Sequence, residues 1–332
     1  MVKRVGNLMQ PICELGNVQE AFLRAAKGKA GKREVREFRS DIDRNLDILR
    51  TQLRDGTFRF GHYHFFTIYD PKRRVICAAS FPERVAFHAI MRICHPVFDE
   101  FQISDSYASR IGKGTYAALD RARLFAAKYR WFVKMDVCKY FDSIHHSVLF
   151  GQLCRLFKDP VLLTYFRELI DGYEVEEGRG LPIGNLTSQY FANHYLAVAD
   201  HYAKERLGVK AIIRYMDDIL LFGNDLDDLR RTSARLAEFI HNELLLELHT
   251  PVINRTRLGI PFLGYVVYAR GLRLNQRSRH RFRHKMKAYT DEVNQGSMSQ
   301  EEYAMRVQCL LAFVNKAEAD GFLHSVAKEM DY

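Results

Sequence analysis

The chain has little of what marks a secreted, disulfide-bonded or membrane protein. Among its 332 residues no apolar stretch approaches the ~20 residues of a membrane span, and the first residues lack the apolar region of a signal peptide. The cysteines show no CxxC spacing and no paired histidine pattern; they are Cys13, Cys77, Cys94, Cys138, Cys154 and Cys309. We therefore expect reduced core thiols, no disulfide framework, no zinc site, and a soluble cytoplasmic protein.

The chain also has no low-complexity linker and no internal repeat. A hydrophobic content of 47% allows a sizeable core, and the length allows two or three subdomains. The formal net charge of +10 attracts polyanions, and the 12% of aromatic residues offers stacking surfaces for bases. This balance is typical of a nucleic-acid-binding protein, although a basic protein with no special partner has the same composition.

The most informative segment is Arg214-Tyr215-Met216-Asp217-Asp218, which lies between the apolar runs Ala211–Ile213 and Ile219–Phe222. Each run is too short and too rich in β-branched residues for a helix, so the segment predicts two strands joined by a tight turn. Adjacent carboxylates at a hairpin tip repel each other, and a divalent cation such as Mg²⁺ is the simplest counter-charge. A solvated Asp-Asp turn is the alternative that the dipeptide alone leaves open.

A second carboxylate, Asp136, ends the mainly apolar run Trp131–Asp136. Such a run predicts a buried strand that delivers an acid at its end. Phosphoryl transfer by two metal ions about 3.5–4 Å apart needs acids from separate elements that converge on one point. Asp136 and Asp217 meet this need, while two unrelated acids at strand ends remain the other interpretation.

Several short motifs occur in a fixed order along roughly residues 15–320. They are Lys72-Arg73-Arg74 with Phe81–Val85, Asp105–Ala108 with Gly112–Thr115, Asp136–Phe141, Tyr215–Asp218 and Phe262–Tyr265. In this order the sequence resembles the reverse transcriptases: the first pair resembles their fingers motif and the second the segment after it. Asp136–Phe141 resembles their first metal-binding motif, Tyr215–Asp218 their catalytic hairpin, and Phe262–Tyr265 the strand that grips the primer end.

The segment Leu181–Gln189 marks the subfamily. Most reverse transcriptases have a glutamine where this chain has Ile183 and a proline where it has Gln189. The pattern is similar to that of diversity-generating retroelement enzymes, which are group II intron-like bacterial reverse transcriptases that copy a template RNA with frequent errors at adenines. Related bacterial reverse transcriptases of uncertain role share this variant.

The resemblance implies a role for each matching residue. Asp136, Asp217 and Asp218 are the expected catalytic residues, and they would hold two Mg²⁺ ions together with the carbonyl of Val137. The residues expected at the incoming deoxynucleotide are Lys72, Arg74, Phe141, Ile183, Gly184 and Gln189. Those expected at the primer and template are Tyr215, Met216, Phe262, Leu263, Gly264, Arg277 and Arg281. For Lys72 and Arg74 an ordinary basic turn is the alternative, and for Phe141 a place in the core.

One departure from the family pattern concerns the general acid. Reverse transcriptases usually carry a lysine after the long palm helix, where it is proposed to protonate the leaving pyrophosphate. The segment Leu248–Arg255 contains no lysine. His249 and Arg255 are the remaining candidates, and a lone histidine there is more often structural.

The apolar spacing predicts alternating helices and strands. The expected helices are 35–53, 82–100, 115–129, 187–206 and 225–248, and the expected strands are 58–69, which turns back at Pro71-Lys72, and 260–268. Beyond Arg270 only helical patterning remains. The mixture indicates an α+β palm, and the resemblance implies a right-hand polymerase fold. The expected domains are an N-terminal extension with fingers at 1–130, which also holds palm segments, a palm at 131–268 and a short helical thumb at 269–332.

Two clusters of positive charge stand out. Eight cations lie between Arg270 and Lys287, more than a solvated helix face requires, so we expect a thumb that contacts phosphates, with a surface helix as the alternative. The N-terminal cluster is weaker and is expected to hold RNA or a partner protein; it contains Arg24, Lys27, Lys29, Lys32 and Arg33.

Together these features predict an RNA-directed DNA polymerase, a nucleotidyltransferase that makes cDNA on a template RNA. Its expected role is targeted mutagenesis by mutagenic retrohoming, with a small basic oligomeric protein, the accessory variability determinant, as partner. The alternatives are a phage-defence or group II intron-like reverse transcriptase without adenine bias, and a silent RNA-binding protein. The short segment after the primer grip leaves no room for nuclease, maturase or ribonuclease H domains, which disfavours a mobile-intron protein.

Overall fold

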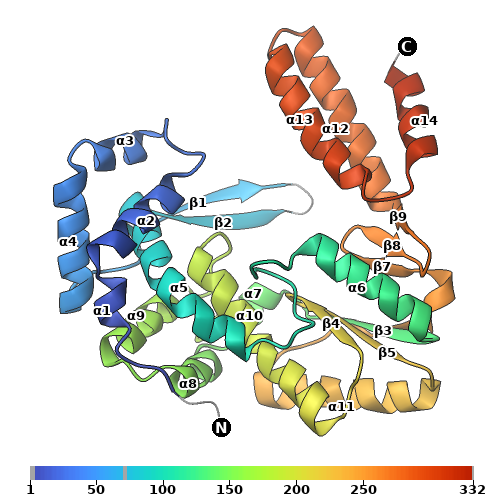
Figure 1. Cartoon of the computed structure of the whole chain (residues 1–332), viewed down its shortest axis with the longest axis horizontal. Helices are drawn as coiled ribbons and strands as arrows, with labels where there is room; N and C mark the ends of the chain where they lie inside the picture. Colours follow the sequence, from blue (N-terminus) through green and yellow to red (C-terminus); the bar gives the residue numbers. More distant parts are fainter. Residues whose placement is uncertain (1–3, 70–72, 331–332) are drawn as a thin grey trace. The chain divides into compact units, whose positions relative to one another are not determined.

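The computed structural model describes residues 4–69 and 73–330 (Figure 1). Helices and strands alternate along the chain, and the strands of the described residues form three separate sheets. This confirms the predicted α+β class. The chain divides into two compact units, each built from separate stretches of sequence. The first comprises Met1–Arg110, Asp136–Gly208 and Arg235–His249, and the second Ile111–Met135, Val209–Ala234 and Thr250–Tyr332.

The first unit is mainly helical and is organised around one long buried helix, α5 (Phe81–Phe101). Helices α2 (Leu15–Ala26) and α10 (Leu186–His201) pack against it. The other helices of this unit are α1 (Met9–Ile12), α3 (Arg33–Arg39), α4 (Ile42–Asp55), α7 (Tyr140–Ser143), α8 (His146–Leu156) and α9 (Pro160–Asp171). Helix α10, expected to reach Arg206, ends at His201 and continues as a π-helical turn, Tyr202–Arg206.

The helix predicted over 35–53 is wrong in one respect, because the structure has two helices there, α3 and α4. The break falls at Ser40 and Asp41. The Ser40 hydroxyl donates to the Glu37 carbonyl at 2.8 Å, and Asp41 has non-helical backbone angles, φ −138° and ψ 60°. Short polar side chains of this kind compete with the helical hydrogen bonds. The predicted stop at Gly56 is confirmed, since this residue is left-handed with φ +72°.

The predicted fingers-type hairpin is present. Strand β1 (Tyr63–Ile68) pairs antiparallel with β2 (Arg74–Ala79), and Lys72 at its turn lies outside the described residues. The base of the hairpin is joined to the start of α5 by Glu83, whose side chain is 1% exposed. Its carboxylate accepts from the backbone N–H groups of Gly61 and His62, at 2.6 and 3.0 Å. These bonds compensate the cost of burying a charge there.

The central sheet of the second unit contains the strands predicted around the acidic motifs. Its order is β4 (Ile212–Tyr215), β5 (Asp218–Gly223), β3 (Trp131–Asp136) and β6 (Val252–Arg255). Helix α6 (Thr115–Lys128) packs against β4, and α11 (Leu226–Leu244) follows β5. The apolar residues of β4 and β5 are buried, as are Phe132 and Val133 of β3, which is why these strands read as apolar runs, whereas Val252 of β6 is exposed.

A second small sheet and three helices complete this unit. Strands β7 (Ile260–Phe262), β8 (Tyr265–Val267) and β9 (Leu272–Leu274) pair antiparallel in that order. The single strand predicted over 260–268 is therefore wrong, because Leu263 and Gly264 have φ values of +50° and +89° and turn the chain back. Strand β9 also corrects the expectation of helical structure alone beyond Arg270.

Helices α12 (Gln276–Asn294) and α13 (Gln300–Val314) lie side by side, and α14 (Asp320–Met330) follows them (Figure 1). The Tyr265 hydroxyl donates to the Phe313 carbonyl at 2.6 Å, so α13 is joined to the small sheet. Ser278 of α12 donates in the same way to the Gly264 carbonyl, at 2.7 Å. These bonds fix the base of the helices on the β7–β8 hairpin.

The cysteines differ in burial. Cys13, Cys77 and Cys94 lie in the core, whereas Cys309 of α13 is exposed, so the expectation of core thiols is wrong for this residue. Among the described residues, no helix combines the length and the apolar character needed to cross a membrane.

Candidate active site

The β4–β5 hairpin presents the acidic motif at its tip. Tyr215 pairs with Asp218, so Met216 and Asp217 form a two-residue turn. Met216 has φ +56°, a conformation that is unfavourable for a residue with a side chain. The buried Arg214 stabilises it, because its guanidinium donates to the Met216 carbonyl at 3.1 Å. The predicted hairpin is confirmed, and Arg214 is a supporting residue that the sequence analysis missed.

The Asp218 carboxylate has a specific partner in the neighbouring strand. Lys134 of β3 lies 2.9 Å from an Asp218 oxygen, with side-chain exposures of 25% and 16%, and its ammonium also donates to the Pro261 carbonyl at 3.2 Å. An ion pair this sheltered from water holds its geometry better than a surface pair. Lys134 was not predicted as a site residue, although a lone cation inside an apolar strand was a signal for a buried partner.

Asp136 is the last residue of β3, the neighbour of β5 in the sheet. Its carbonyl accepts from the backbone N–H of His249 at 2.9 Å, and the buried Val137 bridges to Leu248. Asp136 and Val137 belong to the first unit, whereas Asp217 and Asp218 belong to the second. The backbone at Asp136 is thus fixed by the segment that follows α11.

Tyr215, expected at the primer end, is held within the second unit. Its hydroxyl lies 3.1 Å from the hydroxyl of Thr115, the first residue of α6. This bond orients the tyrosine ring at the end of β4. The sequence analysis placed Thr115 in a family motif but did not predict this contact.

The residues expected around the nucleotide lie in the first unit. Phe141 is half-buried and packs edge-on against Tyr140 at 5.9 Å between ring centroids. The Ile183 carbonyl accepts from Cys77 of β2 at 2.8 Å, and a Cβ on Gly184 would lie 2.6 Å from the Cys77 carbonyl oxygen. Gly184, with φ +123°, therefore lets its own segment approach β2 closely.

Two further residues of this group are exposed. Arg74 begins β2, and Gln189 of α10 accepts from the Ser109 hydroxyl at 3.4 Å. The segment of Ile183 is thus attached to β2, and Gln189 is attached to the loop after α5.

Part of the N-terminal basic cluster faces a cavity of about 320 Å³ in the first unit. Arg24, Lys29 and Lys32 line it together with Arg84 and His88. Burial and then the neighbouring Arg84 and Lys32 lower the pKa of the Lys29 ammonium. Burial, Arg24 and Lys29 lower the pKa of the His88 imidazole. Arg24 and Arg84 are each paired with a carboxylate, of Glu20 and Glu34, which reduces the positive charge that this cavity offers to an anion.

The residues expected to grip the primer lie at the β7–β8 turn. The Phe262 side chain is 1% exposed and belongs to the core, while the half-buried Leu263 and Gly264 form the turn itself. A Cβ on Gly264 would approach Phe313 and the Ser278 hydroxyl to 3.0 Å. Glycine is therefore needed where α12 and α13 pack on this turn.

The basic run of α12 is divided between faces of the helix. Arg277 and Arg281 are exposed one turn apart. Arg279, which is also exposed, and the half-buried Arg283 lie over the Phe322 ring of α14, at 5.8 and 5.0 Å. Arg283 also pairs with Glu329 at 3.1 Å, so the expectation that this run forms one phosphate-contacting surface is too broad for this residue.

Arg255 is wrong as a candidate general acid. Strand β6 runs antiparallel to β3 and pairs Arg255 with Trp131, at the opposite end of β3 from Asp136. Six residues of strand separate these ends by about 17 Å. His249 is exposed and contributes a backbone bond to Asp136.

The donor chemistry of the three acids fits a hard divalent cation, because carboxylate and carbonyl oxygens are the ligands that Mg²⁺ prefers. In residues 4–69 and 73–330 no group of three or more His, Cys, Asp or Glu side chains is gathered closely enough to hold a metal ion. Asp136, Asp217 and Asp218 nevertheless lie at the end of β3, in the hairpin turn and at the start of β5. The strands thus supply oxygen donors from separate elements.

The four-stranded sheet has acids at a hairpin turn and at a neighbouring strand end, and this arrangement agrees with the polymerase domain that the sequence resemblance implies. Residues 72–267 match the family Reverse transcriptase (RNA-dependent DNA polymerase), and the chain belongs to this family. The match covers the predicted fingers motif, both acidic motifs and the primer-grip hairpin.

Individual relatives are more distant. The chain is 24% identical over 220 residues to a COX1/OXI3 intron 1 protein of Saccharomyces cerevisiae, covering 60% of this chain and 26% of that protein. It is 25% identical over 179 residues to the protein YkfC of Escherichia coli K12, covering 48% and 46%. It therefore spans less than half the length of either relative.

The fold is similar to that of telomerase. The structure of telomerase from Candida albicans in complex with a fragment of telomeric RNA matches with a TM-score of 0.52 and 13% identity. The match covers 83% of this chain and 58% of that one. At this identity the likeness shows the polymerase fold alone.

Proposed function

We propose that this chain copies a template RNA into complementary DNA. The observation that carries the proposal is the pair of neighbouring strands β3 and β5, because Asp136 ends β3, Asp218 begins β5, and Asp217 lies in the turn just before β5. Membership of the reverse transcriptase family supports it.

The three carboxylates, with the Val137 carbonyl, would hold two Mg²⁺ ions. When bound, such ions activate the attacking oxygen of a primer and stabilise the charge on the leaving pyrophosphate. The chain's own part is to hold the carboxylates in place: Arg214 fixes the hairpin turn, and Lys134 orients Asp218.

We assign the nucleotide-binding role to residues of the first unit. Arg74 and Lys72 would bind the triphosphate, since guanidinium and ammonium groups suit phosphate oxygens. The half-exposed Phe141 ring would exclude a ribose 2′-hydroxyl. Ile183, Gly184 and Gln189 would lie beside the nascent base pair.

Primer and template contacts are assigned to the second unit. Tyr215 and Met216 would meet the primer end, and the turn at Leu263 and Gly264, supported by the buried Phe262, would grip it. The exposed Arg277 and Arg281 would contact phosphates. In this assignment residues 1–130 hold the fingers, 131–268 the palm and 269–332 the thumb.

We further propose that the enzyme works in the cytoplasm as the polymerase of a diversity-generating retroelement, in mutagenic retrohoming with an accessory variability determinant protein. Ile183 supports this, because it leaves no side-chain hydrogen bond where most relatives have a glutamine. An intron-like reverse transcriptase without adenine bias is the second candidate, favoured by the similarity to the yeast intron protein.

The two candidates differ in their errors. Sequencing of cDNA made from one defined RNA, with the native RNA and partner present, is expected to show excess misincorporation opposite adenine. Ile183→Gln is expected to lower it by about tenfold or less, because a neutral hydrogen bond contributes only ~0.5–1.5 kcal/mol. Equal error rates opposite all four template bases would reject the diversity-generating role and leave an intron-like enzyme.

A further inference from the structure

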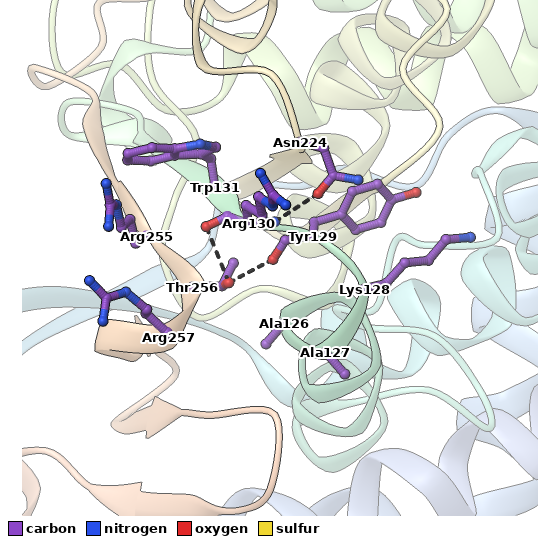
Figure 2. Close-up of a pocket in the computed structure, with 10 residues that line it drawn as sticks. All are labelled: Ala126, Ala127, Lys128, Tyr129, Arg130, Trp131, Asn224, Arg255, Thr256 and Arg257. Atoms are coloured by element: carbon purple, nitrogen blue, oxygen red, sulfur yellow. Dashed lines mark hydrogen bonds between the residues drawn. The ribbon is translucent and has the colours of Figure 1, made fainter.

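A second cationic cavity lies in the second unit, and Figure 2 shows the residues that line it. By its position along β3 and β5 it lies at the other end of the central sheet from the acids. It has a volume of about 790 Å³, within the range of about 300–1,000 Å³ typical of ligand sites. The C-terminal end of α6, the start of β3, the residue after β5 and the end of β6 form its walls. The lining residues are Ala126, Ala127, Lys128, Tyr129, Arg130, Trp131, Asn224, Arg255, Thr256 and Arg257.

Its position separates it from the proposed catalytic residues. Strand β5 begins at Asp218 and ends at Gly223, one residue before Asn224 of the cavity. The six residue steps from Asp218 to Asn224 correspond to about 20 Å of extended chain. Neither Lys134 nor Pro261, which contact Asp218 or its partner, lines the cavity. A ligand here therefore occupies a different site from an incoming nucleotide.

Positive charge dominates the cavity. Lys128, Arg130, Arg255 and Arg257 are all exposed, and within the described parts of the chain none of these side chains is paired with a carboxylate. Other surface arginines of this unit are paired in that way: Arg230 lies 3.3 Å from an oxygen of Asp227. The cavity thus gathers cationic side chains that can attract an anion.

The cavity also offers aromatic and planar surfaces. Trp131 and Tyr129 belong to its wall, and the Arg255 guanidinium lies 5.0 Å from the Trp131 ring centroid. These two residues are opposite each other in the β3–β6 pair, so the stacked arrangement is set by the strand register. Bases of single-stranded RNA stack on tryptophan, tyrosine and arginine planes, whereas an isolated phosphate uses only the charges.

The wall is held together by hydrogen bonds between its segments (Figure 2). The Thr256 hydroxyl donates to the Tyr129 carbonyl at 2.6 Å, and the Thr256 N–H to the Arg130 carbonyl at 3.0 Å. The Asn224 side chain accepts from the Arg130 N–H at 2.9 Å. Figure 2 shows Arg255 and Arg257 on the same side of the cavity, with Lys128 on the other. A fixed frame of this kind lowers the ordering cost of binding.

We propose that this cavity binds a segment of single-stranded RNA through phosphate contacts and base stacking. RNA is favoured over an acidic peptide because the aromatic and guanidinium planes add a surface that carboxylates do not use. The proposal goes beyond polymerisation, since it assigns an RNA contact to the end of the central sheet that lies away from the acids.

The single tryptophan of the chain makes the test direct, because Trp131 reports from the cavity itself. Titrating the full chain with a short single-stranded RNA is expected to change the Trp131 fluorescence in a saturable, salt-dependent way. Arg257→Ala is expected to reduce the slope of log affinity against log salt by about 0.7, which corresponds to about fivefold weaker binding at 0.1 M salt.

Arg230→Ala removes the same charge from the same unit outside the cavity and is expected to leave the slope unchanged. No fluorescence change with RNA, or equal effects of both variants, would overturn the proposal. A larger response to polyglutamate than to RNA would also overturn it and favour an acidic peptide. Primer extension on a minimal template is measured in parallel with the same protein. If the chain shows the fluorescence response but no primer extension, the result contradicts the proposed function and leaves the RNA-binding cavity supported.

Discussion

At the scale of single residues, the charged side chains within apolar strands decide how the acidic motif is held. The sequence predicted that Asp136, Asp217 and Asp218 form the acidic site, and it correctly predicted the hairpin that carries two of them. It did not identify Lys134 and Arg214 as supports, because a side chain's partner across a sheet depends on strand order. Both residues are cations inside apolar runs, and a buried charge requires a partner. The sequence therefore indicated that each has a partner, but it did not indicate which residue that partner is.

Lys134→Ala is expected to lower kcat for primer extension by about 10–100-fold, the usual effect of losing a group that orients a metal ligand. The reason is that Asp218 loses its 2.9 Å contact and the bridge to the Pro261 carbonyl. Steady-state kinetics over a Mg²⁺ titration measures this effect, and Lys134→Arg, which keeps the charge and the donors, is expected to restore much of the rate. An unchanged kcat with an unchanged Mg²⁺ dependence would make Lys134 a packing residue only.

At the scale of elements, α12 shows how a charge run in the sequence separates in three dimensions. Arg277, Arg279 and Arg281 lie exposed, whereas Arg283 is half-buried and pairs with Glu329 of α14 at 3.1 Å. Arg279 and Arg283 both lie over the Phe322 ring of α14. The sequence predicted the helix and its charge, but it did not predict these contacts with α14.

Replacing Arg277 and Arg281 together by alanine is expected to flatten the salt dependence of RNA binding by about 1.4, which is two contacts of ~0.7 each. Replacing Arg279 and Arg283 removes the same charge and is expected to lower thermal stability with little effect on the slope. Fluorescence anisotropy at several salt concentrations compares the two variants. Equal slopes would mean that the exposed pair has no special part in RNA binding.

The segment after Pro182 supplies a further test at this scale. Gly184→Ala places a Cβ 2.6 Å from the Cys77 carbonyl oxygen at φ +123°, so the segment must shift or strain. We expect a loss of about 1–3 kcal/mol in the free energy of unfolding. Chemical denaturation measures it, and Gly151→Ala, where a Cβ would meet nothing within 4 Å, is the control. Equal stability of both variants would contradict the close approach of this segment to β2.

The elements themselves were largely predictable. Amphipathic spacing predicted α5, α6 and α11, and turn residues predicted the β1–β2 and β4–β5 hairpins. The errors fall where a short signal opposed a longer pattern: Ser40 and Asp41 split a helix, and Leu263 with Gly264 folded one strand into two. Such local choices depend on a few kcal/mol of turn and capping energy, which periodicity does not measure.

At the scale of the whole molecule, the sequence predicted domains that follow one another along the chain. Each compact unit of the structure instead combines segments that are far apart in the sequence. The sheet explains the difference, because β3 pairs with β6 across more than a hundred residues (from Trp131 to Arg255), and strand pairing of this range has no local signal. The order of the motifs nevertheless identified the family, since residues 72–267 match it.

The central claim is that the carboxylates of the hairpin carry DNA synthesis on an RNA template. The most direct measurement is primer extension on RNA by the chain and by Asp217→Asn, which keeps the shape of the side chain and removes its charge. Asp227→Asn, at an exposed acid of α11, is the matched control. We expect extension by the unchanged chain and by the control, no extension by Asp217→Asn, and nearly intact RNA binding in all three. Extension by Asp217→Asn at the unchanged rate would contradict the central claim.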